Sequence, residues 1–400
     1  MRVIINGLSA LKPKTGVGHH VAELAHALQQ LNGEDAFTLY PGSYFSRQIR
    51  AVQGGAKKPA NASKPKPRAR WKGWLGSTAK AMAKLSSSVH FTAYTKGFPF
   101  ELYHEPNFLP FRTSLPTIVT VHDLSVLKFP QWHPQDRVRH HHKHFLRGLN
   151  RAQHVIVVSD SVRRELVEEL NCPTSRVSTV HNGIGSQFVP QRVEAIQQMR
   201  RVLNLPEQYF LCVGTIEPRK NLGTVIRAFA DLPAEIRTRC PLVLAGPWGW
   251  RAEQDRDIYE RIGEPAGVRY LGYTQAEYLP ALYAGARVLL YPSHYEGFGM
   301  PPTEMLACGG AVIASTADSL REVLANHALF IEAEDVPAWR DTLLRIANDN
   351  DLLNSLKQGG IAYAQRFSWE RAARETRAVY DRVLYGTPAI PEPSLSRSAA

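Results

Sequence analysis

Short apolar runs and amphipathic stretches alternate along most of the chain, and this alternation is typical of strands and helices in an α/β protein. Helix-like stretches include residues 21–31, 137–150, 160–170 and 367–384. Strands that alternate with helices in this way predict parallel, doubly wound sheets. The apolar runs predict strands at 2–6, 101–104, 116–121, 154–159, 177–181, 209–214, 241–246, 268–272, 287–292, 311–314 and 328–331.

The length predicts two domains, because 400 residues exceed what one common hydrophobic core holds. We expect a first domain over residues 1–190 and a second over residues 191–366, with the polar, helix-like stretch 190–206 as the bridge. A final amphipathic helix is expected over residues 367–385. The tail 386–400 is rich in Pro and Ser, so we expect it to be disordered.

The composition predicts a globular protein of the cytosol. Hydrophobic residues make up 44% of the chain and charged residues 21%, values typical of folded domains. No apolar run approaches the roughly 18 residues needed to cross a bilayer, and the first residues read as a strand rather than a signal peptide. Cys172, Cys212, Cys240 and Cys308 are widely spaced without a C-x-x-C pair, which predicts reduced structural thiols.

The formal net charge of +12 originates in one segment. Residues 51–100 contain ten Lys and Arg and no Asp or Glu, so the rest of the chain is close to neutral. Trp71 and Trp74 lie among these cations, and such a mixture suits the surface of an anionic membrane. A solvated loop without a partner explains the same composition, because Pro and Gly interrupt any helix there. Nucleic acid is disfavoured as the partner, because no recognised nucleic-acid-binding module accompanies the charge.

The stretch 291–310, YPSHYEGFGMPPTEMLACGG, is the strongest candidate for a binding site. A strand leads into it and two prolines predict a helix start, so Gly297 and Gly299 fall in a strand-to-helix loop. Such a loop presents backbone amides and the positive end of a helix dipole to an anion. Glu296 and Glu304 bracket the loop, and two carboxylates there suit a ligand with hydroxyls and phosphates, such as a sugar nucleotide. Taken singly, Glu296 is better explained as surface charge and Glu304 as a partner of the helix dipole.

Together, the two glutamates resemble the Glu-(seven residues)-Glu signature of the retaining GT-B glycosyltransferases of family 4, and the likeness continues through residues 307–323. The resemblance covers nearly the whole chain, with its stronger motifs in the second half. It implies an α/β protein of the GT-B fold, in which two Rossmann-like, doubly wound domains face each other across a cleft. The nucleotide sugar would bind the second domain and the acceptor the first, and the final helix would cross back to the first domain.

The segment 213–221, VGTIEPRKN, resembles this family's diphosphate-binding loop. By itself it is a strand-to-helix loop in which we expect Asn221 to cap the helix. Arg219 and Lys220 would then be ordinary surface cations beside a helix amino terminus. With the resemblance, we expect them to stabilise the negative charge that builds on the leaving phosphate.

The resemblance assigns roles to further residues. Glu304 would hold the ribose hydroxyls, while Glu296 and His122 would hold the transferred sugar. A covalent role for Glu296, as in retaining glycosidases, is the alternative. Tyr273 would lie near the nucleobase, or it simply packs. The remaining donor-side contacts are expected from Gly214, Gly297, Phe298, Gly299 and Met300, the last three through their amides.

His122 and Asp123 follow a predicted buried strand, and open parallel sheets bind ligands at the carboxyl ends of their strands. Taken alone, His122 is better explained as a core histidine with satisfied hydrogen bonds. The resemblance instead places it against the donor sugar. We expect Asp123 to be mainly structural.

The segment TGVG, with Gly16 and Gly18, is predicted as a loop between the first strand and a helix. The full dinucleotide fingerprint fails, because Val21 stands three residues after Gly18 and no acidic ribose ligand follows at the expected distance. A nicotinamide-dependent dehydrogenase is therefore disfavoured. Either the glycines let the loop approach the diphosphate or the acceptor, or they form a tight structural turn.

Two patterns are weak candidates for metal binding. His140 and His144 are four residues apart on one predicted helix, but no carboxylate or Cys stands at a helpful spacing. The run 349–351, Asp-Asn-Asp, looks like a D-x-D metal motif, yet Asx residues at a helix start explain it better. The resemblance implies neither a metal nor a cofactor, because the nucleotide sugar is a substrate.

The phrases TGVGHHVAEL and VHDLSVLKFPQWHP are similar to bacterial mannosyl- and rhamnosyltransferases of O-antigen or exopolysaccharide synthesis. The resemblance implies transfer of mannose or rhamnose from a GDP-linked donor, with retention of configuration. The acceptor would be a lipid-linked glycan at the cytoplasmic face of the inner membrane, which the basic insert would bind. A UDP- or dTDP-linked donor is one alternative. A non-catalytic sugar-nucleotide-binding subunit is another, although it should have lost Lys220 or Glu304 and this chain has both.

Overall fold

The computed structural model describes residues 1–11, 16–31, 33–42 and 88–386. These residues form two compact units. Unit 1 comprises Met1–Val121, Phe145–Ile156 and the residues from Ala373 onward, and unit 2 comprises His122–His144 and Val157–Ala372. Most of the basic insert and the tail 387–400 lie outside the described residues, and the predicted domain boundaries stay predictions.

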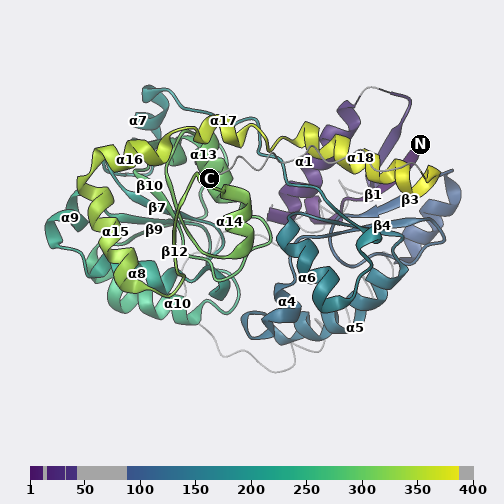
Figure 1. The fold of residues 1–400 in the computed structure, drawn as a ribbon, viewed down its shortest axis with the longest axis horizontal. Coiled ribbons are helices and arrows are strands. Elements are labelled where there is room, and N and C mark those ends of the chain that lie inside the picture. Colours follow the sequence, from purple (N-terminus) through teal and green to yellow (C-terminus); the bar gives the residue numbers. More distant parts are fainter. Residues whose placement is uncertain (12–15, 32, 43–87, 387–400) are drawn as a thin grey trace, which may run out of the picture. The chain divides into compact units, whose positions relative to one another are not determined.

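The first sheet has six strands in the order β2-β1-β3-β4-β5-β6, and the pairs β1–β2, β1–β3 and β3–β4 are parallel. Figure 1 labels β1, β3 and β4 of this sheet. Its central strands are buried on both faces, as expected for a parallel sheet covered by helices. The strands are β1 (Arg2–Asn6), β2 (Ala36–Tyr40), β3 (Leu102–Glu105), β4 (Thr117–Val121), β5 (His154–Val157) and β6 (Val177–Thr179). The helices in this part of the chain include η1 (Leu8–Leu11), α1 (Gly16–Gln30), α4 (Ser125–Lys128), η2 (Pro130–Trp132), α5 (Gln135–Arg151), α6 (Asp160–Leu170) and η3 (Thr174–Arg176).

The second sheet also has six parallel strands, in the order β12-β11-β10-β7-β8-β9. The strands are β7 (Phe210–Val213), β8 (Leu242–Ala245), β9 (Arg269–Gly272), β10 (Val288–Tyr291), β11 (Val312–Ser315) and β12 (Leu329–Ile331). The helices are α7 (Val193–Val202), η4 (Pro218–Lys220), α8 (Leu222–Ala230), α9 (Ala234–Arg239), α10 (Glu253–Ile258), the π-helix η5 (Tyr259–Gly263), α11 (Glu264–Ala266), α12 (Leu279–Gly285), α13 (Met300–Ala307), α14 (Asp318–Leu324), α15 (Val336–Asn348), α16 (Asn350–Lys357), α17 (Gly360–Ala364) and α18 (Trp369–Tyr385).

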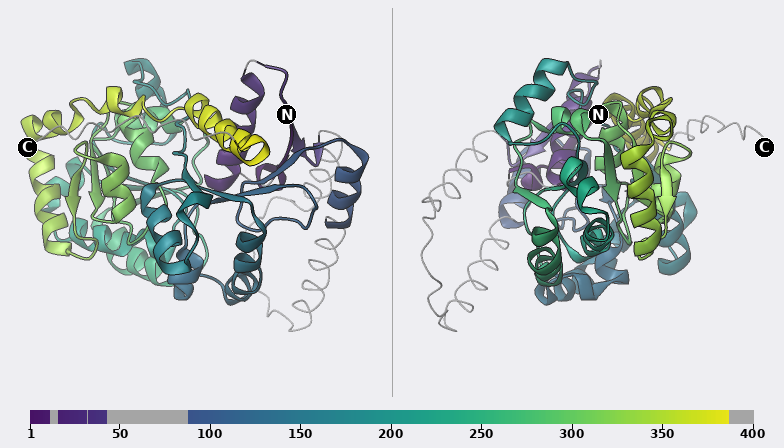
Figure 2. Two further views of the ribbon diagram at one scale, coloured as in Figure 1. Left: turned by 45° about the vertical axis from the view of Figure 1, so that its right-hand side comes forward. Right: turned by 90° about the vertical axis from the view of Figure 1, so that its left-hand side faces the viewer.

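Alternate residues of a central strand point into two different cores of unit 2. Phe210 and Cys212 of β7 belong to the cluster that α8 and α15 cover, while Leu211 belongs to the cluster that α12 and α13 cover. Strand side chains alternate between the two faces of a sheet, so both faces must be apolar when both carry helices. Figure 2 shows helices around this sheet from two further directions. The predicted doubly wound α/β architecture is confirmed.

Three local features differ from the sequence-based predictions. The edge strand β2 was missed, although Phe37 to Tyr40 have high strand propensity. Gly16 and Gly18 lie in the first turn of α1 rather than in a preceding loop. Thr15 lies outside the described residues. Asn221 has a left-handed backbone and caps nothing with its side chain. The prediction for residues 349–351 is confirmed, since Asp349 accepts the Leu352 amide as the cap of α16.

Helix α18 contributes its second half to the core of unit 1. The hydroxyl of Tyr380 lies 2.7 Å from Nδ1 of His104 on β3, and Nε2 of that histidine lies 2.8 Å from the hydroxyl of Thr120 on β4. All three side chains are fully buried.

Within the ranges that the structure describes, no helix is long and apolar enough to cross a membrane.

Tyr380→Phe should lower the free energy of unfolding of unit 1 by about 1–2 kcal/mol, because it removes one buried hydrogen bond while keeping the ring. The expected fall in Tm is a few degrees, measured by differential scanning calorimetry. Tyr385→Phe is the matched control, because that side chain is exposed, and its Tm should not change. An unchanged Tm in Tyr380→Phe would show that the hydrogen bond does not hold the helix.

Candidate functional site

The second sheet reverses its strand order between β7 and β10. In open parallel sheets, ligand sites form beyond the carboxyl ends of the strands at such a switch point. The segment after β7 carries Arg219 and Lys220 in η4, and the segment after β10 carries Glu296. The topology therefore brings two cations and a carboxylate to the place where this type of sheet binds ligands.

Glu296 forms ion pairs with both cations. Nη1 of Arg219 donates to Oε2 of Glu296 at 2.5 Å, and Nζ of Lys220 donates to Oε1 at 2.5 Å. The exposed fractions of these side chains are only 18% for Arg219, 12% for Lys220 and 6% for Glu296. Lys220 also donates to the hydroxyl of Tyr291 and lies 4.5 Å from the centre of its ring. Each carboxylate oxygen thus holds one cation, and the three side chains are fixed together before any ligand binds.

The electrostatics of the cluster keep Glu296 ionised. Burial alone would raise the pKa of Glu296, but the charges and hydrogen bonds of Arg219 and Lys220 lower it to about 2. Burial opposes the charge on Arg219 as well, yet Glu296 and then Glu217 raise its pKa well above the ordinary value. Burial lowers the pKa of Lys220, against the pull of Glu296. Removing one member of such a cluster leaves a buried charge without compensation.

Two further carboxylates, Glu217 and Asp123, flank the same guanidinium, and the sequence analysis gave neither a catalytic role. Nε of Arg219 donates to Oε1 of Glu217 at 2.5 Å, and Glu217 is 3% exposed. Oδ1 of Asp123 accepts the amide and the hydroxyl of Ser125 at 2.9 and 2.6 Å. Burial would raise the pKa of Asp123, but the charge of Arg219 helps to lower it. Within this cluster, three carboxylates therefore surround two cations.

The loop after β10 needs its glycines for close packing and for backbone conformation. A Cβ at Gly297 would overlap the carbonyl oxygen of His122, so the main chains of these two residues are in contact. Gly299 has a φ of +93° and precedes the first turn of α13. The hydroxyl of Ser319 donates to the carbonyl of Glu296 at 2.6 Å. The backbone that carries Glu296 is therefore held from two sides, and one of them is the predicted site residue His122.

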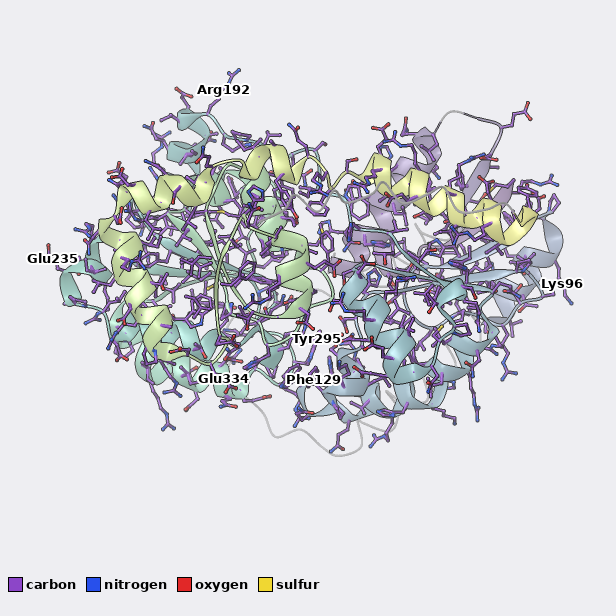
Figure 3. All side chains as sticks on the ribbon, in the orientation of Figure 1. Lys96, Phe129, Arg192, Glu235, Tyr295 and Glu334 are labelled. Carbon is purple, nitrogen blue, oxygen red and sulfur yellow. The ribbon has the colours of Figure 1, made fainter. Side chains whose placement is uncertain are left out.

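Tyr295 connects this loop to two other segments of unit 2. Its hydroxyl donates to Oε2 of Glu165 at 2.6 Å and accepts the amide of Leu124 at 3.0 Å. Its ring centre lies 5.3 Å from that of Phe129 (Figure 3). The carbonyl of Tyr295 accepts from Nη1 of Arg219 at 3.3 Å. These contacts fix the orientation of the residue next to Glu296.

Glu304 lies on α13 in a different environment from Glu296. Its Oε2 accepts the hydroxyl of Tyr283 at 2.8 Å. Burial raises the pKa of Glu304 to about 7, against this hydrogen bond. The two signature glutamates therefore differ in charge state at neutral pH, because one is fully ionised and the other is close to half-protonated.

The other residues that were predicted to contact the donor lie in different environments. Gly214 has a φ of +137°, lies beside the Lys220 side chain and lines a small cavity at the carboxyl ends of β7, β8 and β10. Phe298 is buried against Phe367, with ring centres 5.5 Å apart, and Met300 packs on the same apolar cluster. Tyr273 is 69% exposed and is not among the residues that line the cavity. The site thus gathers Glu296, Arg219, Lys220, Gly214, Gly297 and the main chain of His122.

His140 and His144, the histidines considered as a metal site, both lie on α5. The rings of His140 and His144 are in contact on α5, with centres 4.7 Å apart. Across the residues that the structure describes, no three His, Cys, Asp or Glu side chains are arranged to hold a metal ion.

Comparisons with known proteins show the family and the fold. Residues 14–188 match the family model Glycosyltransferase Family 4, and residues 195–363 match the model Glycosyl transferases group 1. The O-antigen chain mannosyltransferase B of Escherichia coli is 32% identical over 383 residues, which cover 95% of this chain and 99% of that protein. Sucrose-phosphate synthase from Thermosynechococcus elongatus superposes with a TM-score of 0.71 at 20% identity, covering 97% of this chain and 100% of that one. HepE of Anabaena, solved in complex with UDP-glucose, gives a TM-score of 0.68 at 17% identity, covering 95% of this chain and 99% of the other.

Sequence and fold lead to the same assignment. The two family models together match most of the chain, and the solved structures share its two-sheet architecture. Arg219, Lys220 and Glu296 lie within the residues 195–363 that match the second family model. This chain belongs to the glycosyltransferases of family 4 with the GT-B fold.

Proposed function

We propose that this glycosyltransferase moves mannose, or the related rhamnose, from a GDP-linked donor to a lipid-linked oligosaccharide during synthesis of a bacterial surface polysaccharide, either O-antigen or exopolysaccharide. The observation that carries the proposal is the buried cluster of Arg219, Glu296 and Lys220 at the switch point of the second sheet. The choice of mannose and of O-antigen is supported by the 32% identity to the O-antigen chain mannosyltransferase B.

The chemistry of transfer explains why the site holds two cations. The bond between the anomeric carbon and the diphosphate oxygen breaks, so negative charge builds on the leaving phosphate. Arg219 offers a planar fork of N–H donors and Lys220 a compact charge, and preorganised donors of this kind contribute several kcal/mol to such a step. The two cations supply the charge that a divalent ion would otherwise bring, and we propose that no metal is required.

In the proposed reaction, donor binding exchanges one anion for another. In the structure, the carboxylate of Glu296 occupies N–H groups that the diphosphate would use. Once displaced, Glu296 accepts hydroxyls of the donor sugar, with His122 beside it. In this position Glu296 accepts hydrogen bonds from the sugar, and we propose that it positions the sugar rather than deprotonating the acceptor. The acceptor attacks on the face that the phosphate leaves, and the departing phosphate oxygen takes its proton, which retains the anomeric configuration.

We propose the following remaining contacts for the donor and the acceptor. Glu304 would accept the ribose hydroxyls, and the exposed ring of Tyr273 would be available to the nucleobase. In the first sheet the strand order reverses between β1 and β3, where Nδ2 of Asn6 donates to Oε2 of Glu105 at 2.6 Å. Open sheets bind ligands at such a place, so this edge is the proposed acceptor side, together with Gly16 and Gly18.

We also propose that the protein works at the cytoplasmic face of the inner membrane. The tryptophan-containing part of the basic insert, which would contact the membrane, lies outside the described residues. At its described end, Val89 is 63% exposed and Phe98 is 53% exposed beside the cation Lys96. Apolar side chains next to lysines suit the interface of an anionic bilayer.

Two alternatives use the same fold. HepE was solved with UDP-glucose, so a UDP-linked donor, or a dTDP-linked one, is the first alternative. The transfer assay with each nucleotide sugar in turn separates these donors from GDP-mannose. A non-catalytic sugar-nucleotide-binding subunit is the second alternative, and it would bind a donor without turnover.

Lys220→Ala should lower kcat for mannose transfer from GDP-mannose by on the order of 100-fold, because one of the two charges on the leaving phosphate is lost. Transfer is measured with a mannose-terminated lipid-linked oligosaccharide, and circular dichroism reports the folded fraction. Arg261→Ala is the matched control, since that Arg side chain is 78% exposed. Full activity of the folded Lys220→Ala variant would contradict the proposed function.

The product should carry the same anomeric configuration as the donor, which the one-bond carbon–hydrogen coupling of the new linkage reports by NMR. Incubation with GDP-mannose alone should leave the intact mass of the protein unchanged, because Glu296 is not the nucleophile in this account. A stable hexose adduct on Glu296 would instead support the glycosidase-like route.

The affinity for GDP-mannose should rise roughly tenfold between pH 6 and pH 8, because the ionised fraction of a group with a pKa near 7 grows from about a tenth to about nine tenths over that range. The pKa of Glu304 is raised to about 7, and ribose hydroxyls donate to its ionised form. Isothermal titration calorimetry measures the affinity at each pH. In Glu304→Gln the rise should disappear, and an equally steep rise in that variant would exclude Glu304 as the titrating group.

A further inference from the structure

Glu217 is the most deeply placed charged residue of the cluster, and the proposed reaction leaves it without a role. It stands directly before η4 with an extended backbone and is 3% exposed. Its carbonyl accepts the amide of Lys220 at 2.9 Å, and its Oε1 accepts Nε of Arg219 at 2.5 Å. The side chain of Glu217 therefore contacts the guanidinium of Arg219, and its main chain contacts the main chain of Lys220.

The guanidinium of Arg219 is held at two different edges. Glu217 contacts Nε, whereas Glu296 and the carbonyl of Tyr295 contact Nη1. A guanidinium is planar and rigid, so a partner at Nε fixes the direction in which the Nη1 group points. Glu217 is thus the contact that aims Arg219 at the place now occupied by Glu296.

This contact matters most when the donor is bound. Glu296 then exchanges its place on Arg219 for the diphosphate and the sugar, so it no longer fixes the guanidinium. The second oxygen of Glu217, Oε2, is buried and accepts no hydrogen bond from the residues that the structure describes. A buried carboxylate oxygen without a donor is costly, so a second N–H of the same guanidinium edge would be a favourable partner. Bidentate pairing through Nε and Nη2 would hold Arg219 while Nη1 engages the phosphate.

We propose that Glu217 is a positioning residue for glycosyl transfer, which keeps the guanidinium of Arg219 directed at the leaving phosphate after Glu296 has moved to the sugar. The inference rests on the proposed function, because it requires a diphosphate at Arg219. It assigns Glu217 no contact with the substrate.

Two substitutions at Glu217 separate its hydrogen bond from its charge. Glu217→Ala removes the acceptor for Nε, and kcat for mannose transfer should fall by on the order of 30-fold or more, because misdirected donors lose stabilisation of the transition state. Glu217→Gln keeps an acceptor oxygen, so kcat should stay within about threefold of the wild type even if the KM for GDP-mannose changes. Glu260→Gln, an exposed glutamate of the same unit, is the matched control.

The results of these assays distinguish failure of the proposed function from failure of the role of Glu217. A wild type that neither binds GDP-mannose nor transfers mannose would contradict the proposed function itself. With an active wild type, equal kcat values for Glu217→Ala and the wild type would overturn the role of Glu217. A Glu217→Gln variant as inactive as Glu217→Ala would overturn positioning through the hydrogen bond. If Glu217→Ala does not fold, Glu217→Asp is the second variant. It keeps the charge but shortens the side chain by one methylene, so kcat should fall about tenfold. An unchanged kcat would again overturn the inference.

Discussion

A single carboxylate, that of Glu296, holds Arg219 and Lys220 in one buried cluster, and the geometry of the site depends on this interaction. Each cation meets one oxygen, so neither is free to extend into solvent. Burial makes every charge in the cluster expensive, which means that the three groups stabilise one another's ionised states. The switch point between β7 and β10 is what allows segments far apart in sequence to meet in this way.

The ion pairs of Glu296 with Arg219 and Lys220 also determine how a diphosphate would bind to these two cations. From the sequence, Arg219 and Lys220 suggested a cationic pocket that draws an anion. In the folded chain, Glu217, Glu296 and Asp123 surround these two cations, so their charge is already compensated. In the proposed reaction, a diphosphate would therefore replace a carboxylate rather than fill an empty positive site. Such an exchange would release Glu296 only when a donor is present, which would couple the binding of the phosphates to the binding of the sugar.

Much of the fold could be predicted because the strands of unit 2 are buried on both faces. Runs such as β7 and β10 are continuously apolar, and a local pattern is enough to find them. The edge strand β2 was missed because only two of its five residues are buried and its apolar pattern is short. Asn221 was predicted to be a helix cap from its position alone. Its side-chain amide instead donates to the carbonyls of Pro292 and Ala333, which are distant in sequence. Long-range partners of this kind leave no local signal.

In the candidate site, too, the sequence predicts some features and not others. The sequence motifs identified Glu296, Arg219 and Lys220, because residue types and spacing carry that information. Their pairing, and the contact between Gly297 and the carbonyl of His122, are tertiary features that spacing does not encode. The decisive experiment is a crystal structure of the protein with bound GDP. We expect phosphate oxygens at Nη1 of Arg219 and Nζ of Lys220, with Glu296 displaced from both cations. GDP bound elsewhere, or Glu296 still paired with both cations, would contradict the proposed exchange.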